Sequence, residues 1–228
     1  MIGVPINPLN WRGILEAPMH SILRRSANVA ALLFVFLAIA FVSRDSIIIA
    51  GVDTVHHLVL VDELARHHTV LPADASRLEV MSIYPSGSHW VAALLAPVAG
   101  SGLVAMTWVA IGSIFLCYAM LFWLAQRDLG IASAAVFAAI LFIASPLQSL
   151  IGWEIIDNFF YPQLVANALL LAFLCLTVLS GVAERLLPAL TPLFGAVLMN
   201  FHPLVAIQAM GAGLTIMMTT ITQKWWSR

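Results

Sequence analysis

The chain has 228 residues, of which 62% are hydrophobic and only 9% are charged. Soluble domains are about 45–50% apolar and about 25% charged, and a chain of this size has too little interior to hide the excess apolar surface. The composition therefore excludes a water-soluble globular domain and predicts an integral membrane protein. The formal net charge of -1 also excludes a protein that binds nucleic acid through bulk positive charge.

The first uncharged stretch runs from residue 26 to residue 43 and is rich in Ala, Val, Leu and Phe. A helix needs roughly 20 such residues to cross the hydrocarbon core of a bilayer, so this stretch is predicted to be the first transmembrane helix. A cleaved signal peptide is the competing interpretation. Residues 1–25 would make too long a leader, however, and no small-residue cleavage site follows closely after Val42.

Most acidic and histidine residues lie between positions 44 and 79, so the segment 44–102 is predicted to lie outside the membrane. Its apolar run 90–99 is too short to cross a bilayer, and we expect a helix at the interface there. Further spans are expected at about 103–125, 130–148, 161–181, 187–200 and 204–222, with a helix-breaking turn around His202-Pro203 between the last two. The predicted fold is an all-α transmembrane bundle of about six spans.

Lys and Arg residues favour one orientation of this bundle. With both termini in the cytoplasm, seven of the ten basic residues lie inside, and only Arg44, Arg66 and Arg77 lie outside. Basic residues near the ends of spans favour the cytoplasmic side. Counting 90–99 as a full span would move Arg127 outside and the acidic loop around residue 154 inside. We therefore predict a multi-pass protein of the inner (plasma) membrane with these parts: cytoplasmic segment 1–25, first helix 26–43, extracytoplasmic loop 44–102, a bundle of about five helices over 103–223, and cytoplasmic tail 224–228.

This orientation gathers the polar residues of interest on the outer side. Six of the seven histidines fall there: His56, His57, His67, His68, His89 and His202. The acids Asp53, Glu154 and Asp157 lie in the same outer loops. Such sorting of titratable groups favours an enzyme, and a solvated acidic face is the alternative.

The order of motifs resembles the first part of GT-C fold glycosyltransferases, over about residues 27–205. The similar elements are an Asp soon after the first span and followed by His, a helix, a Leu-Pro pair, and Tyr-Pro-x-Gly-x-His before an apolar helix. Here they are Asp53-Thr54-Val55-His56, the stretch to Arg66, Leu71-Pro72, and Tyr84 to His89. A later Arg127-Asp128-Leu129-Gly130 segment and a span that ends in Ser145-Pro146 also fit the pattern.

The resemblance implies an enzyme that takes a sugar from a polyprenyl-phosphate donor and passes it to a glycan, lipid or protein on the outer membrane face. By position, Asp53 would be the base or would position the acceptor, and Glu154 or Asp157 would be the second acid. A carboxylate within hydrogen-bond reach can accept the proton that the acceptor hydroxyl loses. The candidates for substrate binding are His56, His57, Tyr84, His89 and His202.

Each candidate also has a structural interpretation. Asp53 is a favoured N-cap residue for a helix that begins near Thr54. On a helical wheel, Asp53, His56, Glu63 and His67 share one face, which could hold a divalent cation such as Mg²⁺ or Mn²⁺ or could simply be hydrated. The segment Tyr84-Pro85-Ser86-Gly87 is typical of a turn. His202 either binds phosphate or satisfies backbone carbonyls at a helix end.

Members of the resembled superfamily usually have further spans, so three interpretations stay open. The chain is a small transferase completed by other membrane subunits, a fragment of a longer one, or a structural subunit of a larger membrane complex without activity. A transporter is less consistent with the sequence, because no charge lies in the middle of a span. The expected partners are membrane lipid, a polyprenyl-phosphate-linked sugar and other membrane subunits, and no nucleic acid is expected.

Overall fold

The computed structural model describes residues 11–49, 52–69, 78–129, 159–180 and 183–226. Within these residues every regular element is a helix, so the predicted all-α fold is confirmed there. The elements are α1 (Trp11–Ile49), α2 (Val52–His67), the 3₁₀ helix η1 (Glu79–Ile83), α4 (Gly87–Ala99), α5 (Gly102–Leu129), α8 (Tyr161–Ser180), α9 (Ala183–Met199) and α10 (Pro203–Trp226).

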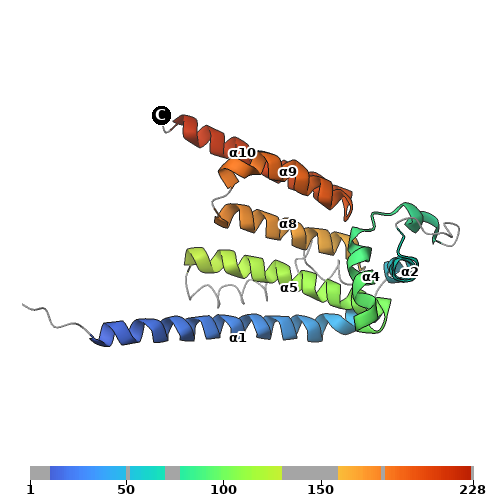
Figure 1. Cartoon of the computed structure of the whole chain (residues 1–228), viewed down its shortest axis with the longest axis horizontal. Coiled ribbons are helices and arrows are strands. Elements are labelled where there is room, and N and C mark those ends of the chain that lie inside the picture. The colour runs from blue at the N-terminus through green and yellow to red at the C-terminus, as the bar shows by residue number, and fades with distance from the viewer. Residues whose placement is uncertain (1–10, 50–51, 70–77, 130–158, 181–182, 227–228) are drawn as a thin grey trace, which may run out of the picture.

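The long helices lie side by side, and two shorter helices lie across one end of them. Helix α5 packs against α1 on one side and α8 on the other, while α8 also contacts α9 and α10. Helices α2 and α4 run across this end of the bundle and pack against each other and against α5 (Figure 1). The start of α1 and the end of α10 lie at the opposite end (Figure 1).

Among the described residues, three helices are long and apolar enough to cross a membrane: Ser26–Asp45 within α1, Gly102–Ala125 within α5, and Pro203–Thr220 within α10. They coincide with three of the predicted spans. Two other predicted spans, 161–181 and 187–200, are helices whose apolar parts are shorter, Tyr161–Thr177 and Leu186–Met199. The sixth, 130–148, lies outside the described residues.

Helix α4 corresponds to the predicted interfacial helix, although it begins three residues earlier than the predicted 90–99. It ends at Gly100, whose φ of 88° places it in the left-handed region and whose N–H donates to the Ala96 carbonyl. Glycine adopts this conformation without the steric cost of a Cβ atom. Ser101 Oγ then accepts a hydrogen bond from the Val104 N–H at the start of α5. These two caps let the chain turn sharply from α4 into α5.

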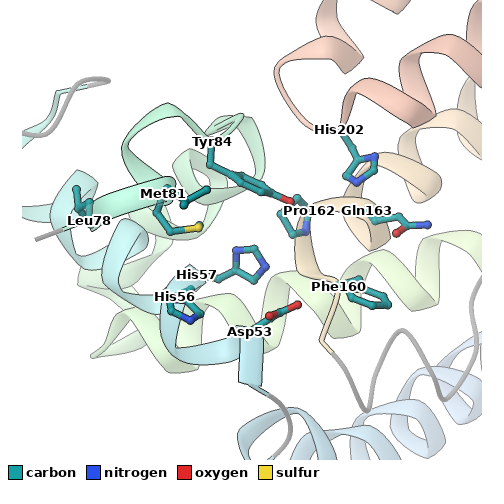
Figure 2. A pocket seen from close by; sticks show the side chains of 11 residues that line it. Asp53, His56, His57, Leu78, Met81, Tyr84, Phe160, Pro162, Gln163 and His202 are labelled. Carbon is teal, nitrogen blue, oxygen red and sulfur yellow. The ribbon is translucent and has the colours of Figure 1, made fainter. Parts of the chain in front are cut away.

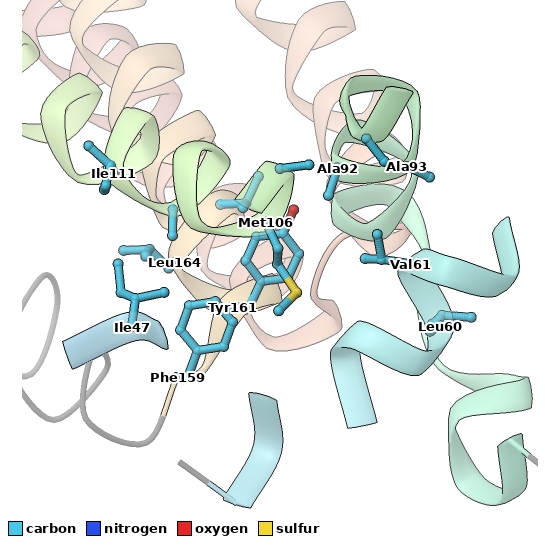
Figure 3. Close-up of a cluster of buried hydrophobic side chains, with 14 of the residues drawn as sticks. Ile47, Leu60, Val61, Ala92, Ala93, Met106, Ile111, Phe159, Tyr161 and Leu164 are labelled. Atoms are coloured by element: carbon cyan, nitrogen blue, oxygen red, sulfur yellow. The ribbon is translucent and has the colours of Figure 1, made fainter. Parts of the chain in front are cut away.

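A buried core joins the crossing helices to the bundle (Figure 3). Ala92 and Ala93 of α4 pack with Val61 of α2 and Met106 of α5, and all four are buried. Small side chains on α4 allow this close approach. The start of α8 is held to the same core by Tyr161, whose hydroxyl donates to the Ser88 carbonyl at 2.7 Å.

The turn between α9 and α10 is also fixed to α4. The Gly87 N–H donates to the Asn200 carbonyl oxygen at 2.7 Å. A Cβ atom at position 87 would lie 2.7 Å from that same oxygen, closer than real Cβ atoms come to another atom. Glycine therefore allows the start of α4 to touch the turn that carries His202.

Gly87→Ala is expected to lower the stability of the protein by about 1–3 kcal/mol, the usual cost of overpacking a close contact. Thermal unfolding in detergent measures this loss. The matched control is Gly112→Ala within α5, where, apart from the neighbouring backbone of α5 itself, no atom of the described residues lies within 4 Å of an added Cβ. Since alanine is a better helix former than glycine, the control should be neutral or stabilising. Equal unfolding temperatures for Gly87→Ala and the wild type would contradict the close contact.

Candidate functional site

A pocket of about 290 Å³ lies at the end of the bundle that α2 and α4 cross (Figure 2). Its size is at the lower limit of small-molecule sites, which span about 300–1,000 Å³. The pocket mixes polar and apolar side chains from four separate stretches of the chain. They are Asp53, His56, His57, Leu78, Val80, Met81, Tyr84, Phe160, Pro162, Gln163 and His202.

The structure brings five of the predicted site residues into this one pocket. Asp53, His56 and His57 come from the first turns of α2, Tyr84 from the segment between η1 and α4, and His202 from the turn before α10. Of the other candidates, His89 is fully buried and does not line the pocket. Glu154 and Asp157 lie outside the described residues, so their relation to the pocket stays a prediction.

Three helices begin at the pocket wall. Asp53 is in the first turn of α2, Pro162 and Gln163 are in the first turn of α8, and His202 directly precedes α10. The start of a helix carries backbone N–H groups without partners and about half a positive charge. The start of α2 already carries the Asp53 carboxylate, so the starts of α8 and α10 are the places that favour a negatively charged group, such as phosphate, in the pocket.

Two histidines form a buried pair beside Asp53. His57 Nδ1 and His89 Nε2 are 3.0 Å apart, which is hydrogen-bond distance. Burial lowers the pKa of His57 to about 4, although the Asp53 carboxylate partly opposes this shift. Burial and the neighbouring His57 lower the pKa of His89 to about 3. Both rings are therefore neutral at pH 7.

This pair predicts a particular dependence of stability on pH. The ordinary pKa of 6.5 for both histidines applies in the unfolded chain, whereas the folded-state pKa values are about 4 and about 3. The unfolded state therefore binds protons first, and the free energy of unfolding should fall as the pH drops from 6.5 towards 4. Thermal unfolding at pH 7.5 and pH 5 (about one pH unit or more on either side of 6.5) measures this fall.

The double variant His57→Gln/His89→Gln is the control, because it removes both titrating rings and keeps polar side chains. Its unfolding temperature should change less with pH than that of the wild type. The same loss of stability in the double variant at low pH would show that other groups cause it.

Tyr84 and His202 face the pocket from other segments. Burial, and then the Asp53 carboxylate, raise the pKa of Tyr84, so its hydroxyl keeps its proton and can donate a hydrogen bond. Burial lowers the pKa of His202. Its Nδ1 atom is buried and has no hydrogen-bond partner among the described residues. An unpaired buried nitrogen costs about 1–3 kcal/mol, which a ligand in the pocket could recover by bonding to it.

The helix face that could hold a divalent cation or could simply be hydrated is divided by the structure. Asp53 and His56 line the pocket, but Glu63 is buried one helical turn from His67 and lies 3.4 Å from its ring. In the described part of the chain, no three His, Cys, Asp or Glu side chains are grouped closely enough to hold a metal ion.

The sequence analysis did not select three residues of the pocket wall near the start of α8: Phe160, which precedes the helix, and Pro162 and Gln163, which lie in its first turn. A signal for them was present in Pro162, since proline in the first turn of a helix marks its start. A helix that starts after a predicted outer loop is expected to begin at the end of the bundle where the other candidates gather. Neither family models, nor curated proteins, nor solved structures give a match to this chain.

Proposed function

We propose that the protein is an integral membrane glycosyltransferase similar to the GT-C enzymes. It transfers a sugar from a polyprenyl-phosphate donor to a hydroxyl group of a glycan, lipid or protein of the cell envelope, on the extracytoplasmic face. The observation that carries the proposal is the meeting of one carboxylate, Asp53, with the starts of α8 and α10 and with His202 in a single pocket. A base and an anion-binding wall are the two groups that this transfer needs.

The position of the pocket suits a donor that enters from lipid. In the proposed six-span arrangement, the pocket end of the bundle faces the outside and both termini lie in the cytoplasm. Helix α4 then lies at the outer interface, where its exposed side chains Val91, Leu94, Leu95 and Val98 contact lipid. A polyprenyl chain can stay in the bilayer while its phosphate reaches the pocket.

The chemistry proposed for the pocket is a single displacement with inversion. The acceptor oxygen forms a bond to the anomeric carbon while the bond from that carbon to the phosphate oxygen breaks. Asp53 takes the hydroxyl proton. Polyprenyl phosphate leaves with one more negative charge, which the starts of α8 and α10 and His202 stabilise. His56 and Tyr84 supply further hydrogen bonds to the substrate, and Glu154 or Asp157 is the proposed second acid.

The experiment that tests the function is transfer by wild-type protein in membranes supplied with polyprenyl-phosphate sugars. Incorporation of sugar into envelope material that depends on the protein supports the proposal. Wild-type protein that transfers no sugar from any polyprenyl-phosphate donor would contradict it and would favour the structural-subunit interpretation.

His202→Leu is expected to raise the KM for the polyprenyl-phosphate donor about tenfold, because one hydrogen bond to the phosphate is lost. His202→Gln keeps a donor group and should raise the KM less. His67→Leu is the matched control, since His67 is half exposed and outside the pocket. An unchanged donor KM in His202→Leu would remove this residue from the donor site.

A further inference from the structure

The histidine pair connects the pocket to the protein interior. His57 lines the pocket, whereas His89 is fully buried behind it at the start of α4. The aromatic rings of Tyr84 and Tyr161 pack around both, with ring centroids between 5.7 and 6.1 Å from those of the histidines. The titratable groups that face His57 are thus Asp53, His56, Tyr84, His89 and Tyr161.

The hydrogen bonds of His89 determine where the protons of the pair are. The His89 ring interacts with the backbone carbonyl of Pro85, which can only accept a hydrogen bond. Its Nδ1 atom also lies 3.4 Å from Ser88 Oγ, and a hydroxyl can accept as well as donate. The Nε2 atom of His89 faces His57, so the ring nitrogen that donates to Pro85 is Nδ1. A neutral imidazole has one proton, and His89 Nε2 must therefore be an acceptor. The proton between the two rings consequently belongs to His57 Nδ1.

We propose that His89 is a positioning residue: it fixes His57 as the Nδ1-protonated tautomer, so that His57 Nε2 presents a lone pair to the pocket and accepts a hydrogen bond from the acceptor hydroxyl. This inference rests on the proposed function and adds to it which part of the substrate His57 binds. A lone pair attracts a hydroxyl proton and repels phosphate oxygens.

The polar groups of the pocket are accordingly divided between the two substrates. Asp53 and His57 lie on one side, and both accept protons or hydrogen bonds (Figure 2). His202 and Gln163 lie across the pocket, next to the starts of α10 and α8 (Figure 2). The first side takes the hydroxyl and the second takes the phosphate. His57 would also hold the hydroxyl close to the Asp53 carboxylate that removes its proton.

The test uses two variants of one buried residue. In His89→Gln the side-chain oxygen takes the place of Nε2 and still accepts from His57, whereas in His89→Asn the amide takes the place of Nδ1 and leaves His57 without an acceptor. Histidine ¹⁵N NMR of the full chain in detergent reports which ring nitrogens carry protons, and the His57→Gln variant assigns the signals. Thermal unfolding of both variants checks that they are folded to a similar degree.

At pH 7 we expect His57 to be protonated on Nδ1 alone in the wild type and in His89→Gln, and to become a mixture of tautomers in His89→Asn. At saturating donor, His89→Asn should transfer sugar roughly 3- to 10-fold more slowly than His89→Gln, as expected for one hydrogen bond, with the same donor KM. A raised donor KM in His89→Asn would overturn the assignment of His57 to the hydroxyl side.

The NMR result is independent of turnover. A wild-type His57 protonated on Nε2, or a His57 tautomer that is the same in His89→Asn as in the wild type, would overturn the positioning role even if the protein transfers sugar. Absence of transfer by the wild type would instead reject the proposed function and the hydroxyl contact with it, while the NMR result would still decide whether His89 fixes the tautomer.

Discussion

The variant Asp53→Asn is expected to transfer sugar about 10²–10⁴-fold more slowly than the wild type, the usual contribution of a general base. Asparagine has the size of aspartate. Helix α2 begins at Val52 and not near Thr54, so Asp53 lies inside the first turn and is not the expected N-cap; losing its charge there costs about 0.3–1 kcal/mol and should affect folding little. Because only the carboxylate is removed, the loss should appear in kcat and not in the donor KM. Transfer rates in membranes and thermal unfolding in detergent measure the two effects separately.

Two controls separate catalysis from stabilisation of α2. Asp45→Asn removes an exposed carboxylate near the end of α1 that does not line the pocket, and it should leave transfer unchanged. Asp53→Ala removes the same charge from the first turn of α2, and it should lose activity and about 0.3–1 kcal/mol of stability, as Asp53→Asn does. If Asp53 only stabilises the start of α2, both variants will lose this stability and keep the wild-type rate. Wild-type rates in Asp53→Asn would therefore remove Asp53 from the mechanism.

The contents of the pocket could be predicted to a large extent from the topology of the chain. Successive spans run in opposite directions, so alternate connections reach the same end of a bundle. This rule was enough to place Asp53, Tyr84 and His202 at one end, although the first and last are far apart in sequence. It needed the order of spans and no knowledge of how the helices are rotated.

Rotation and packing of the helices could not be predicted in this way. The spacing of the Tyr84–His89 motif does not show that His89 turns towards His57 and away from the pocket, because that depends on how α4 packs against α2. The helical wheel placed Glu63 on the same face as Asp53, but ten residues separate the two by about 15 Å along the axis of α2, and Glu63 is buried away from the pocket. Which side chains meet across two helices depends on how the helices are rotated relative to each other. The periodicity of one helix gives no information about that rotation.

The ends of the helices differ from the predicted ends for another reason. The first span was predicted to stop at residue 43, yet α1 continues through Arg44 and Asp45 to Ile49 and begins well before residue 26. Charged residues mark where a helix leaves the hydrocarbon, but arginine is a good helix former and does not end the helix itself. Turn residues, such as Gly100 after α4, mark the ends of helices more accurately.

The variant Ala110→Arg is expected to lose most of the folded, membrane-inserted protein. Ala110 is fully buried and lies well inside α5, within the apolar stretch that is long enough to cross a membrane. Arginine at the centre of a span costs about 2.5–3.5 kcal/mol on insertion scales. Its bulk in a packed site adds about 1–3 kcal/mol. The amount of protein that remains in washed membranes, and its unfolding temperature in detergent, measure the loss.

The matched substitution Ala99→Arg tests the different placement of α4. Ala99 is the last residue of that helix and only partly buried, and a cation is favourable at the C-terminal end of a helix. If α4 lies at the interface, Ala99→Arg should cost less than about 1 kcal/mol, and the protein should insert as the wild type does. Similar losses in Ala99→Arg and Ala110→Arg would place α4 within the hydrocarbon. The start of α4 and the neighbouring pocket would then lie deeper in the membrane than the interface. That result would contradict the proposed entry of a lipid-linked donor at the interface.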